Sequence, residues 1–239
     1  MSVMDVPVAN AQMPELVSWF SDKRGLTQPL IAYALHVGGM VRLHENPSYR
    51  SILMSSSVVY ADGVGPVMVG RAMGGKLGRA ATTDLGPEVL AQWSANGAPP
   101  RIALIGGPDG LARDAGLELE RLGLGKLVFS ENGYHEDWAS VLSSVRDSHP
   151  DILFVGMGAP REMEWCVEFR SLLPKCVVMT CGGWFGFLVG NEKRAPQWAQ
   201  KAGGEWIWRL AQSPMRLGGR YGKGAFVVAR ALLAATRSR

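Results

Sequence analysis

An aspartate stands at the end of a short apolar run, at a position where a carboxylate can act as a general base. Val58-Val59-Tyr60 is followed by Ala61, Asp62 and Gly63. Residues directly after the strands of an open parallel sheet line its ligand cleft, and a carboxylate there can take a proton from a hydroxyl nucleophile. An Asp-Gly pair also forms plain turns or caps helices. Asp62 is therefore a candidate base, with the turn as the alternative.

Glycine-rich segments follow two further apolar runs. Gly106 and Gly107 come after one run, and Gly158 and Arg161 come after another. Such glycines let backbone amides approach a phosphate or ribose at the start of a helix, although the same pattern makes ordinary tight turns. A dinucleotide fingerprint needs a third glycine where Arg161 stands. We therefore expect no dinucleotide fingerprint, and we expect Arg161 to suit a pyrophosphate.

A third turn, Asn132-Gly133-Tyr134, carries an aromatic side chain. Gly133 keeps the backbone open, and Tyr134 offers a ring on which a nucleobase can stack. A simple surface turn is the alternative interpretation.

Motifs of several other chemistries are missing from the sequence. Gly125-Lys126 is followed by Leu127, so the phosphate loop of nucleotide triphosphatases is absent, as is the G-x-S-x-G of serine hydrolases. No Asp-x-Asp occurs, which removes the short acidic motif by which many sugar transferases hold a divalent metal. The four histidines lack ligand spacing with the three cysteines. We predict that the protein has no metal site and needs no cofactor.

The elements that position these residues alternate between buried strands and amphipathic helices. Apolar runs typical of strands buried in a parallel sheet are Ile31–Leu35, Val58–Tyr60, Arg101–Ile105, Leu127–Ser130, Ile152–Val155 and Cys176–Thr180. Helical patterns cover Asp109–Leu122, Asp137–Ser148 and Glu162–Leu173. This alternation predicts an α/β fold with a mostly parallel, Rossmann-like sheet flanked by helices.

Composition and charge narrow the class of protein further. The 239 residues are 47% apolar and 19% charged, enough to bury a core. The run Phe226–Ala235 contains Arg230 and is about half of the roughly 20 residues that span a bilayer. The N-terminus lacks a signal-peptide pattern. Cys166, Cys176 and Cys181 match no zinc spacing, so we expect reduced, buried thiols in a cytoplasmic protein.

The net charge of +4 conceals an asymmetry between the two ends of the chain. Residues 206–239 hold seven basic side chains and no acidic one, so the other 18 basic and 21 acidic residues leave positions 1–205 at −3. Such a cationic end meets phosphate on a nucleic acid, a lipid surface or a pyrophosphate, or is only a solvated tail. The sheet pattern stops near Arg194, which predicts a catalytic core over 1–193 and a basic helical appendage over 194–239.

Several strings together resemble the bacterial WecG/TagA/CpsF glycosyltransferase family over roughly 29–221. They are Ala61-Asp62-Gly63-Val64-Gly65, Arg79 with Asp84-Leu85, Pro150 to Arg161 with Trp165, Lys193-Arg194-Ala195-Pro196 with Trp198, Glu205-Trp206 with Arg209-Leu210, and Pro214, Arg216 and Arg220-Tyr221. The resemblance implies a Rossmann-like, inverting, metal-independent transferase. Such an enzyme moves a hexose or N-acetylhexosamine from a UDP-sugar to an undecaprenyl-pyrophosphate-linked saccharide in surface polysaccharide synthesis.

The resemblance also implies roles for particular residues. Asp62 corresponds to the family's proposed base, and Arg209 and Arg216 to arginines that reach the pyrophosphates of donor or acceptor. Substrate contacts are further expected at Arg79, Asp84 and Glu162. The appendage is expected to dock on the inner face of the cytoplasmic membrane and to close the active site. Apart from the resemblance, we expect that an appendage which can detach hides its apolar face by self-association away from the membrane.

Some polar positions depart from the family pattern. Ala34 and His36 stand where a Thr-x-Asn is common, and we expect His36 to replace the Asn as a sugar-binding group. Glu162-Met163 replaces a Gln-Glu pair, and Gly186 replaces an aspartate between two phenylalanines. These changes bear on which sugar is moved, or on whether the protein is active. The alternative function is a nucleotide-sensing or nucleic-acid-binding α/β module, but no nucleic-acid fold motif is recognisable, so we expect no nucleic-acid partner.

Overall fold

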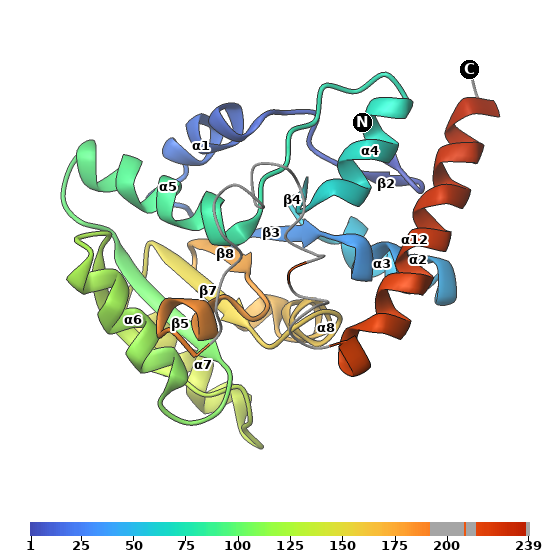
Figure 1. The fold of residues 1–239 in the computed structure, drawn as a ribbon. Coiled ribbons are helices and arrows are strands. Elements are labelled where there is room, and N and C mark those ends of the chain that lie inside the picture. Colours follow the sequence, from blue (N-terminus) through green and yellow to red (C-terminus); the bar gives the residue numbers. More distant parts are fainter. Residues whose placement is uncertain (192–207, 209–213, 238–239) are drawn as a thin grey trace.

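A parallel sheet forms the centre of the protein. The computed structural model describes residues 1–191, 208 and 214–237. Within them, six parallel strands lie in the order β4-β3-β8-β7-β5-β6 (Figure 1). Their bounds are β3 Leu30–Leu35, β4 Val58–Ala61, β5 Arg101–Gly106, β6 Lys126–Glu131, β7 Ile152–Gly156 and β8 Val177–Thr180. The six predicted strands are confirmed, and no bound differs by more than one residue.

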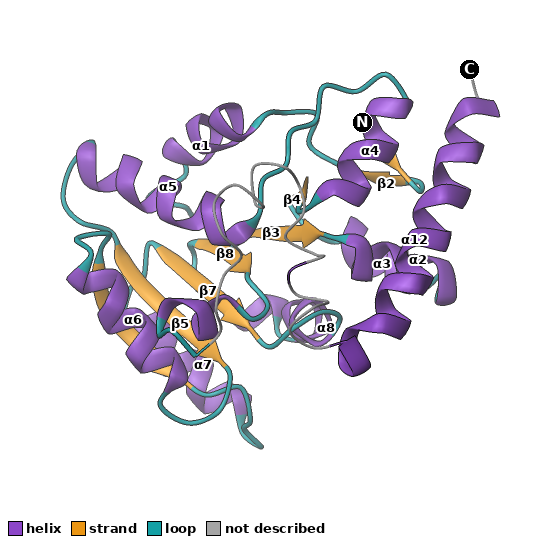
Figure 2. Ribbon diagram, viewed as in Figure 1, coloured by secondary structure: helices purple, strands orange, loops and turns teal. Residues whose placement is uncertain are grey.

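Helices cover both faces of the sheet (Figure 2). Alternate strand residues point to opposite faces, so Ile31, Tyr33 and Leu35 join one apolar cluster while Ala32 and Ala34 join the other. The first cluster takes α2 Val37–Glu45, α3 Tyr49–Met54, α4 Val64–Ala72, α7 Trp138–Asp147, α8 Arg161–Glu168 and α12 Pro214–Arg237. The second takes α1 Met13–Ser21, α5 Thr82–Ala95, α6 Leu111–Arg121 and α9 Trp184–Leu188. The predicted doubly covered α/β fold is confirmed.

Two of the three predicted helices are continuous, and the third is divided. α6 buries Ala112, Ala115 and Leu119 at helical spacing, and α7 begins after Asp137, whose carboxylate accepts the N–H of Ser140. The predicted helix over 162–173 is divided into two parts: α8, which ends at Glu168, and a 3₁₀ turn, η1 Arg170–Leu172. Pro174 follows, and a residue before proline is disfavoured in the helical region. A short hairpin, β1 Ser2–Val3 with β2 Val6–Pro7, precedes α1.

The C-terminal helix α12 packs against α2 and α4 (Figure 1). The approach is close because glycines stand at the crossings. A Cβ added to Gly224 would lie 2.4 Å from Cγ1 of Val37, and one added to Gly65 would lie 3.1 Å from Cγ2 of Val228. The predicted boundary at 193/194 falls outside the described residues, and the division into core and appendage stays a prediction. No helix in the described ranges is both long and apolar enough to cross a membrane.

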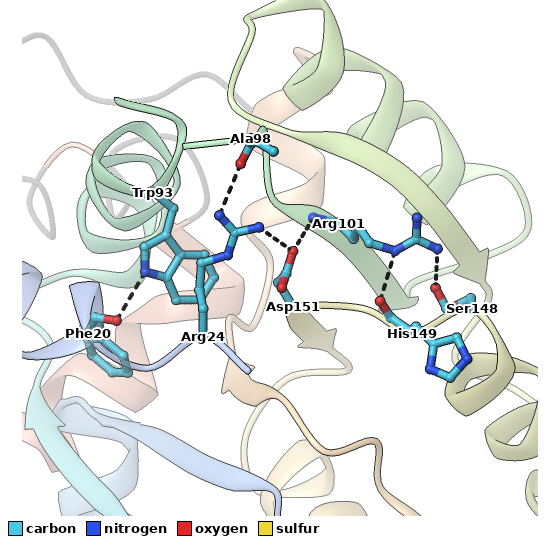
Figure 3. A network of polar contacts seen from close by, with 8 residues as sticks. All are labelled: Phe20, Arg24, Trp93, Ala98, Arg101, Ser148, His149 and Asp151. Carbon is cyan, nitrogen blue, oxygen red and sulfur yellow. Dashed lines mark hydrogen bonds and ion pairs between the residues drawn. The ribbon is translucent and has the colours of Figure 1, made fainter. Parts of the chain in front are cut away.

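A polar network joins the amino ends of β5 and β7 (Figure 3). One carboxylate oxygen of Asp151 accepts the Nη2–H of Arg24 and the backbone N–H of Arg101, each at 2.8 Å. The guanidinium of Arg24 also donates to Ala98 O at 3.0 Å and lies 5.8 Å from the ring centroid of Trp93. Asp151 therefore ties the start of β7 to β5 and to the loop after α1. Asp151 belongs to one of the strings that carry the family resemblance. It nevertheless lies at the amino ends of the strands, opposite to the carboxyl ends where the site residues stand.

We expect Asp151→Ala to lower the free energy of unfolding by about 1–3 kcal/mol, because the substitution leaves a backbone N–H and a guanidinium without their shared acceptor. Chemical denaturation followed by tryptophan fluorescence measures the change. Asp147→Ala, which removes an exposed carboxylate at the end of α7, is the matched control. A loss no larger in Asp151→Ala than in the control would show that the network does not stabilise the sheet.

Candidate active site

The parallel strands bring the predicted site residues to one edge of the sheet. His36 follows β3, Asp62 follows β4, Gly107 follows β5, Gly133 follows β6 by two residues, and Gly158 follows β7 in the same way. Because β3, β4, β5, β6 and β7 run parallel, these positions share the carboxyl edge, where open α/β sheets bind ligands. The glycines at 182 and 183 follow β8 and join them.

Asp62 extends from the end of β4 with a partly exposed side chain. Its backbone N–H donates to Leu35 O at 2.8 Å, which continues the pairing of β3 with β4. The N-cap residue of α4 is Gly63, at φ +99°, which has no side chain to cap the helix. The backbone of Asp62 is held by the sheet, and its carboxylate charge lies near enough to Tyr60 and Glu162 to raise the pKa of each.

Arg79 and Asp84 lie beside the end of β4. The backbone N–H of Ala80 donates to Ala61 O at 2.9 Å, so the segment before α5 runs next to the residue that precedes Asp62. Arg79 Nη1 lies 3.2 Å from Asp84 Oδ2, with both side chains partly exposed. The two predicted substrate contacts are therefore brought together and pair with each other.

His36 is the N-cap of α2. Its Nδ1 accepts the backbone N–H of Gly39 at 3.2 Å. In the neutral ring the proton then sits on Nε2. The half-buried imidazole lies next to Val37, the residue that Gly224 of α12 approaches. Its predicted role in binding the sugar is compatible with this position and stays a prediction.

A cavity of about 230 Å³ opens at the carboxyl edge between the ends of β5, β7 and β8. Its lining residues are Gly107, Leu111, Gly156, Met157, Gly158, Gly182, Gly183, Phe185 and Gly186. The walls are therefore largely main chain. Glycine is required where the strands separate, since a Cβ on Gly106 would lie 2.2 Å from Gly156 O.

The amides of the predicted glycines are engaged within the protein. Gly107 N–H donates to Gly156 O at 3.1 Å, and Gly133 N–H donates to Gly107 O at 2.9 Å. Gly158 N–H donates to the carboxylate of Glu162 at 2.9 Å. These three N–H groups are therefore occupied by acceptors of the protein itself, one of them the Glu162 carboxylate. The glycines shape the cavity by their lack of side chains, and direct contact with a ligand stays a prediction.

Arg161, Gly133 and Tyr134 form one cluster at the mouth of the site. A guanidinium N–H of Arg161 donates to Gly133 O, and its central carbon lies 4.7 Å from the ring centroid of Tyr134. The carboxamide oxygen of Asn132 accepts the N–H of Tyr134 at 2.7 Å, which fixes the turn. Tyr134 is 66% exposed. The cluster thus presents a cation stacked on an aromatic ring whose surface is largely open.

Glu162 is buried, which its expected role in substrate binding does not explain. Only 2% of the residue is exposed, and its Oε2 accepts the backbone N–H groups of Met157 at 3.2 Å, Gly158 at 2.9 Å and Gly182 at 3.0 Å. Burial raises its pKa from 4.5 to about 7, the three N–H donors oppose that rise, and the charge of Asp62 adds to it. Glu162 lies beneath the cavity and binds its two rims.

The remaining predicted site residues, Arg209 and Arg216, belong to the C-terminal part of the chain. Arg209 lies outside the described residues, as do Trp198 and Trp206. Arg216 belongs to α12, about two helical turns before Gly224. The cysteines are buried, unpaired thiols, as predicted. No group of three or more His, Cys, Asp or Glu side chains in the described ranges is arranged to hold a metal ion.

Sequence reasoning missed the contribution of β8. Gly182-Gly183 follows this strand just as Gly106-Gly107 ends and follows β5, so the same pattern would have found it. The partner of these glycines was harder to recognise. Gly182 and Glu162 are twenty residues apart, and only the strand order shows that they meet.

Comparisons with known proteins agree with this architecture. The profile described as "Glycosyl transferase WecG/TagA/CpsF family" matches residues 1–239. A protein of Bacillus subtilis named N-acetylglucosaminyldiphosphoundecaprenol N-acetyl-beta-D-mannosaminyltransferase is 28% identical over 222 residues, which cover 90% of this chain and 84% of the relative. A protein of the same name from Bacillus spizizenii is 30% identical over 174 residues, covering 72% of this chain and 67% of the relative.

The raised pKa of Glu162 predicts a pH dependence of stability. The folded protein holds this proton up to about pH 7, whereas the unfolded chain releases it near 4.5, so the carboxyl favours folding at low pH. Its contribution is lost as the pH rises from 4.5 to 7 and amounts to about 3 kcal/mol. Glu162→Gln does not titrate. We expect the difference in unfolding free energy between wild type and Glu162→Gln to fall by that amount over this range in urea denaturation.

Glu164→Gln is the control for that measurement, because Glu164 lies on the same helix and is exposed. A wild-type minus Glu162→Gln difference that stays constant from pH 4.5 to 7.5 would contradict the assignment.

Proposed function

The chain belongs to the WecG/TagA/CpsF family of glycosyltransferases, and we propose that it is an inverting, metal-independent enzyme acting on lipid-linked sugars. It transfers a hexose or an N-acetylhexosamine from a UDP-sugar to an undecaprenyl-pyrophosphate-linked saccharide during cell-surface polysaccharide synthesis. The names of the two Bacillus relatives support this substrate class. The observation that carries the proposal is the partly exposed carboxylate of Asp62 at the same sheet edge as the glycine-walled cavity.

In the proposed reaction Asp62 acts as the general base. Its carboxylate takes the proton of the acceptor hydroxyl while the hydroxyl oxygen attacks the anomeric carbon of the donor sugar from the face opposite to UDP. The bond from that carbon to the diphosphate oxygen breaks, and UDP leaves with the bonding electrons, so the configuration inverts. Holding both reactants at one sheet edge supports this step, since positioned general bases contribute about 10²–10⁴-fold to rate.

In this proposal, arginine side chains stabilise the negative charge of the leaving diphosphate. The amides of Gly107 and Gly158 are engaged. Arg161 also donates one N–H, to Gly133 O, and its exposed guanidinium has further N–H groups with which to bind a diphosphate. Arginine binds phosphate oxygens in a bidentate manner. Arg209 and Arg216 would add to it from the appendage. The packing of α12 against the first residues of α2 and α4, which follow His36 and Asp62 closely, supports closure of the site from that side.

The choice of sugar is proposed to depend on three positions that differ from the family pattern. Ala34 is buried in β3, His36 caps α2, and Gly186 lines the cavity. All three lie at or near the carboxyl edge, so changes in their size and polarity alter the site directly. A hexose donor is therefore as compatible with this chain as the N-acetylmannosamine in the names of its relatives.

The protein is further proposed to work on the inner face of the cytoplasmic membrane. Phe226 and Leu233 of α12 are 60% and 61% exposed, whereas Val227 is buried, and Arg230 lies between the two exposed residues in the sequence. Apolar and basic side chains on one helix suit adsorption to an anionic lipid surface. In the absence of lipid, the exposed side chains of Phe226 and Leu233 favour self-association through α12.

Transfer itself is tested by incubating the protein with a panel of UDP-sugars and measuring release of UDP, with and without a short-chain lipid-pyrophosphate saccharide. We expect release with at least one donor, and only when the acceptor is present. Salt-sensitive binding of DNA with no sugar transfer would favour the alternative of a binding module.

Asp62→Asn should lower turnover by about 10²–10⁴-fold, because an amide cannot accept the proton of the acceptor hydroxyl. The Kd for UDP, measured by calorimetry, should stay within about threefold of wild type, since the change is isosteric. Asp109→Asn, an exposed aspartate in the loop before α6, serves as the control. Wild-type turnover in Asp62→Asn would exclude Asp62 as the base.

Tyr134→Ala should weaken UDP binding by about tenfold, because stacking of a base on an aromatic ring is worth about 1–3 kcal/mol. Tyr134→Phe keeps the ring and should bind UDP as wild type does. Equal affinities of all three proteins in the same calorimetric titration would show that the nucleobase does not stack here.

A further inference from the structure

A single carboxylate oxygen connects the two loops that form the walls of the cavity. Met157 and Gly158 follow β7, and Gly182 follows β8. Their three backbone N–H groups converge on Oε2 of Glu162 at 3.2, 2.9 and 3.0 Å. Glu162 itself stands in the first turn of α8. One side chain thus joins a helix start to two strand ends.

The pairing of β7 with β8 stops before these loops. The pairing of β7 with β8 ends with Cys181 N–H donating to Val155 O at 2.9 Å. Beyond that bond, Gly158 adopts φ +80° and Gly182 adopts φ +55°, conformations that suit glycine and allow many alternatives. Both glycines line the cavity. Glu162 is a side chain that bonds to the loops on both sides of it.

We propose that Glu162 is a positioning residue, which holds the loops after β7 and β8 at the separation that the nucleotide of the donor requires. The inference rests on the proposed function, because it takes the cavity as the donor site. Glu162 acts without touching the donor, since it is almost fully buried beneath the loops. This role differs from the substrate contact expected of it from the sequence.

The chemistry of the group fits this role. Three N–H dipoles directed at one oxygen stabilise a negative charge in a buried position. An apolar side chain of the same size could not accept these hydrogen bonds. The same bonds turn the amides of Gly158 and Gly182 away from the cavity. A glutamine at this position still offers one amide oxygen to the three N–H groups, whereas alanine offers none.

Hydrogen exchange and UDP binding together test the proposal with three variants. Glu162→Ala removes the acceptor, Glu162→Gln keeps one, and Glu164→Ala removes an exposed carboxylate from the same helix turn. Amide exchange is measured on the free protein, and the Kd for UDP is measured by calorimetry. Melting temperatures are recorded so that local loosening is separated from global loss of stability.

In Glu162→Ala the amides of Met157, Gly158 and Gly182 should exchange at least tenfold faster, while those within β7 and β8 keep their protection. The Kd for UDP should rise about tenfold. Glu162→Gln should restore both quantities to within about threefold of wild type, and Glu164→Ala should alter neither. If Glu162→Ala does not fold, Glu162→Asp replaces it, since the shorter side chain cannot reach all three donors and should give smaller changes of the same kind.

If the three amides exchange in Glu162→Ala as they do in wild type, Glu162 does not hold the two loops together. Faster exchange with an unchanged Kd for UDP would overturn the positioning role. If wild type does not bind UDP, the proposed function fails and the donor role fails with it. The exchange of the three amides then still shows whether Glu162 joins the loops.

Discussion

The convergence of three backbone N–H groups on the Glu162 carboxylate is the interaction on which the site depends. It lies where strand pairing ends and loops begin. Because the group is buried and its pKa is raised to about 7, it carries a cost that the three donors offset. Asp62 is the same kind of group in a different environment. Asp62 is partly exposed, whereas Glu162 is buried, and the two carboxyl groups are accordingly proposed to have different roles.

The two edges of the sheet carry different tasks. At the amino edge, Asp151 joins Arg24 and Arg101 in a network that secures the strands. At the carboxyl edge, glycines line a cavity, and Asp62 and Arg161 lie along the same edge after β4 and β7. The string from 150 to 161 crosses from one edge to the other along β7. The residues of that string therefore have two tasks: Asp151 stabilises the sheet, and Gly156, Met157 and Gly158 line the cavity.

Local sequence patterns predicted the strands of the six-stranded sheet and the turn residues that follow them. Runs of Val, Ile and Leu indicated every strand of the sheet, and the turn residues after them located Asp62, Gly107 and Gly158. The helices before residue 100 were missed, and the engagement of the glycine amides was not foreseen. Both depend on tertiary contacts. Arg161 reaches Gly133 across 28 positions, and no spacing rule contains such a pair.

The main-chain walls of the cavity have a consequence for how such an enzyme diversifies. A pocket lined by side chains can be reshaped one residue at a time, but six of the nine residues around this one are glycines, and two of them, Gly107 and Gly156, leave no room for a Cβ. Substitution is thus restricted at these two positions, whereas Gly183 has open space for a side chain and Gly186 already stands where the family pattern has an aspartate. A family member can therefore change one part of this wall while the part at the ends of β5 and β7 stays glycine.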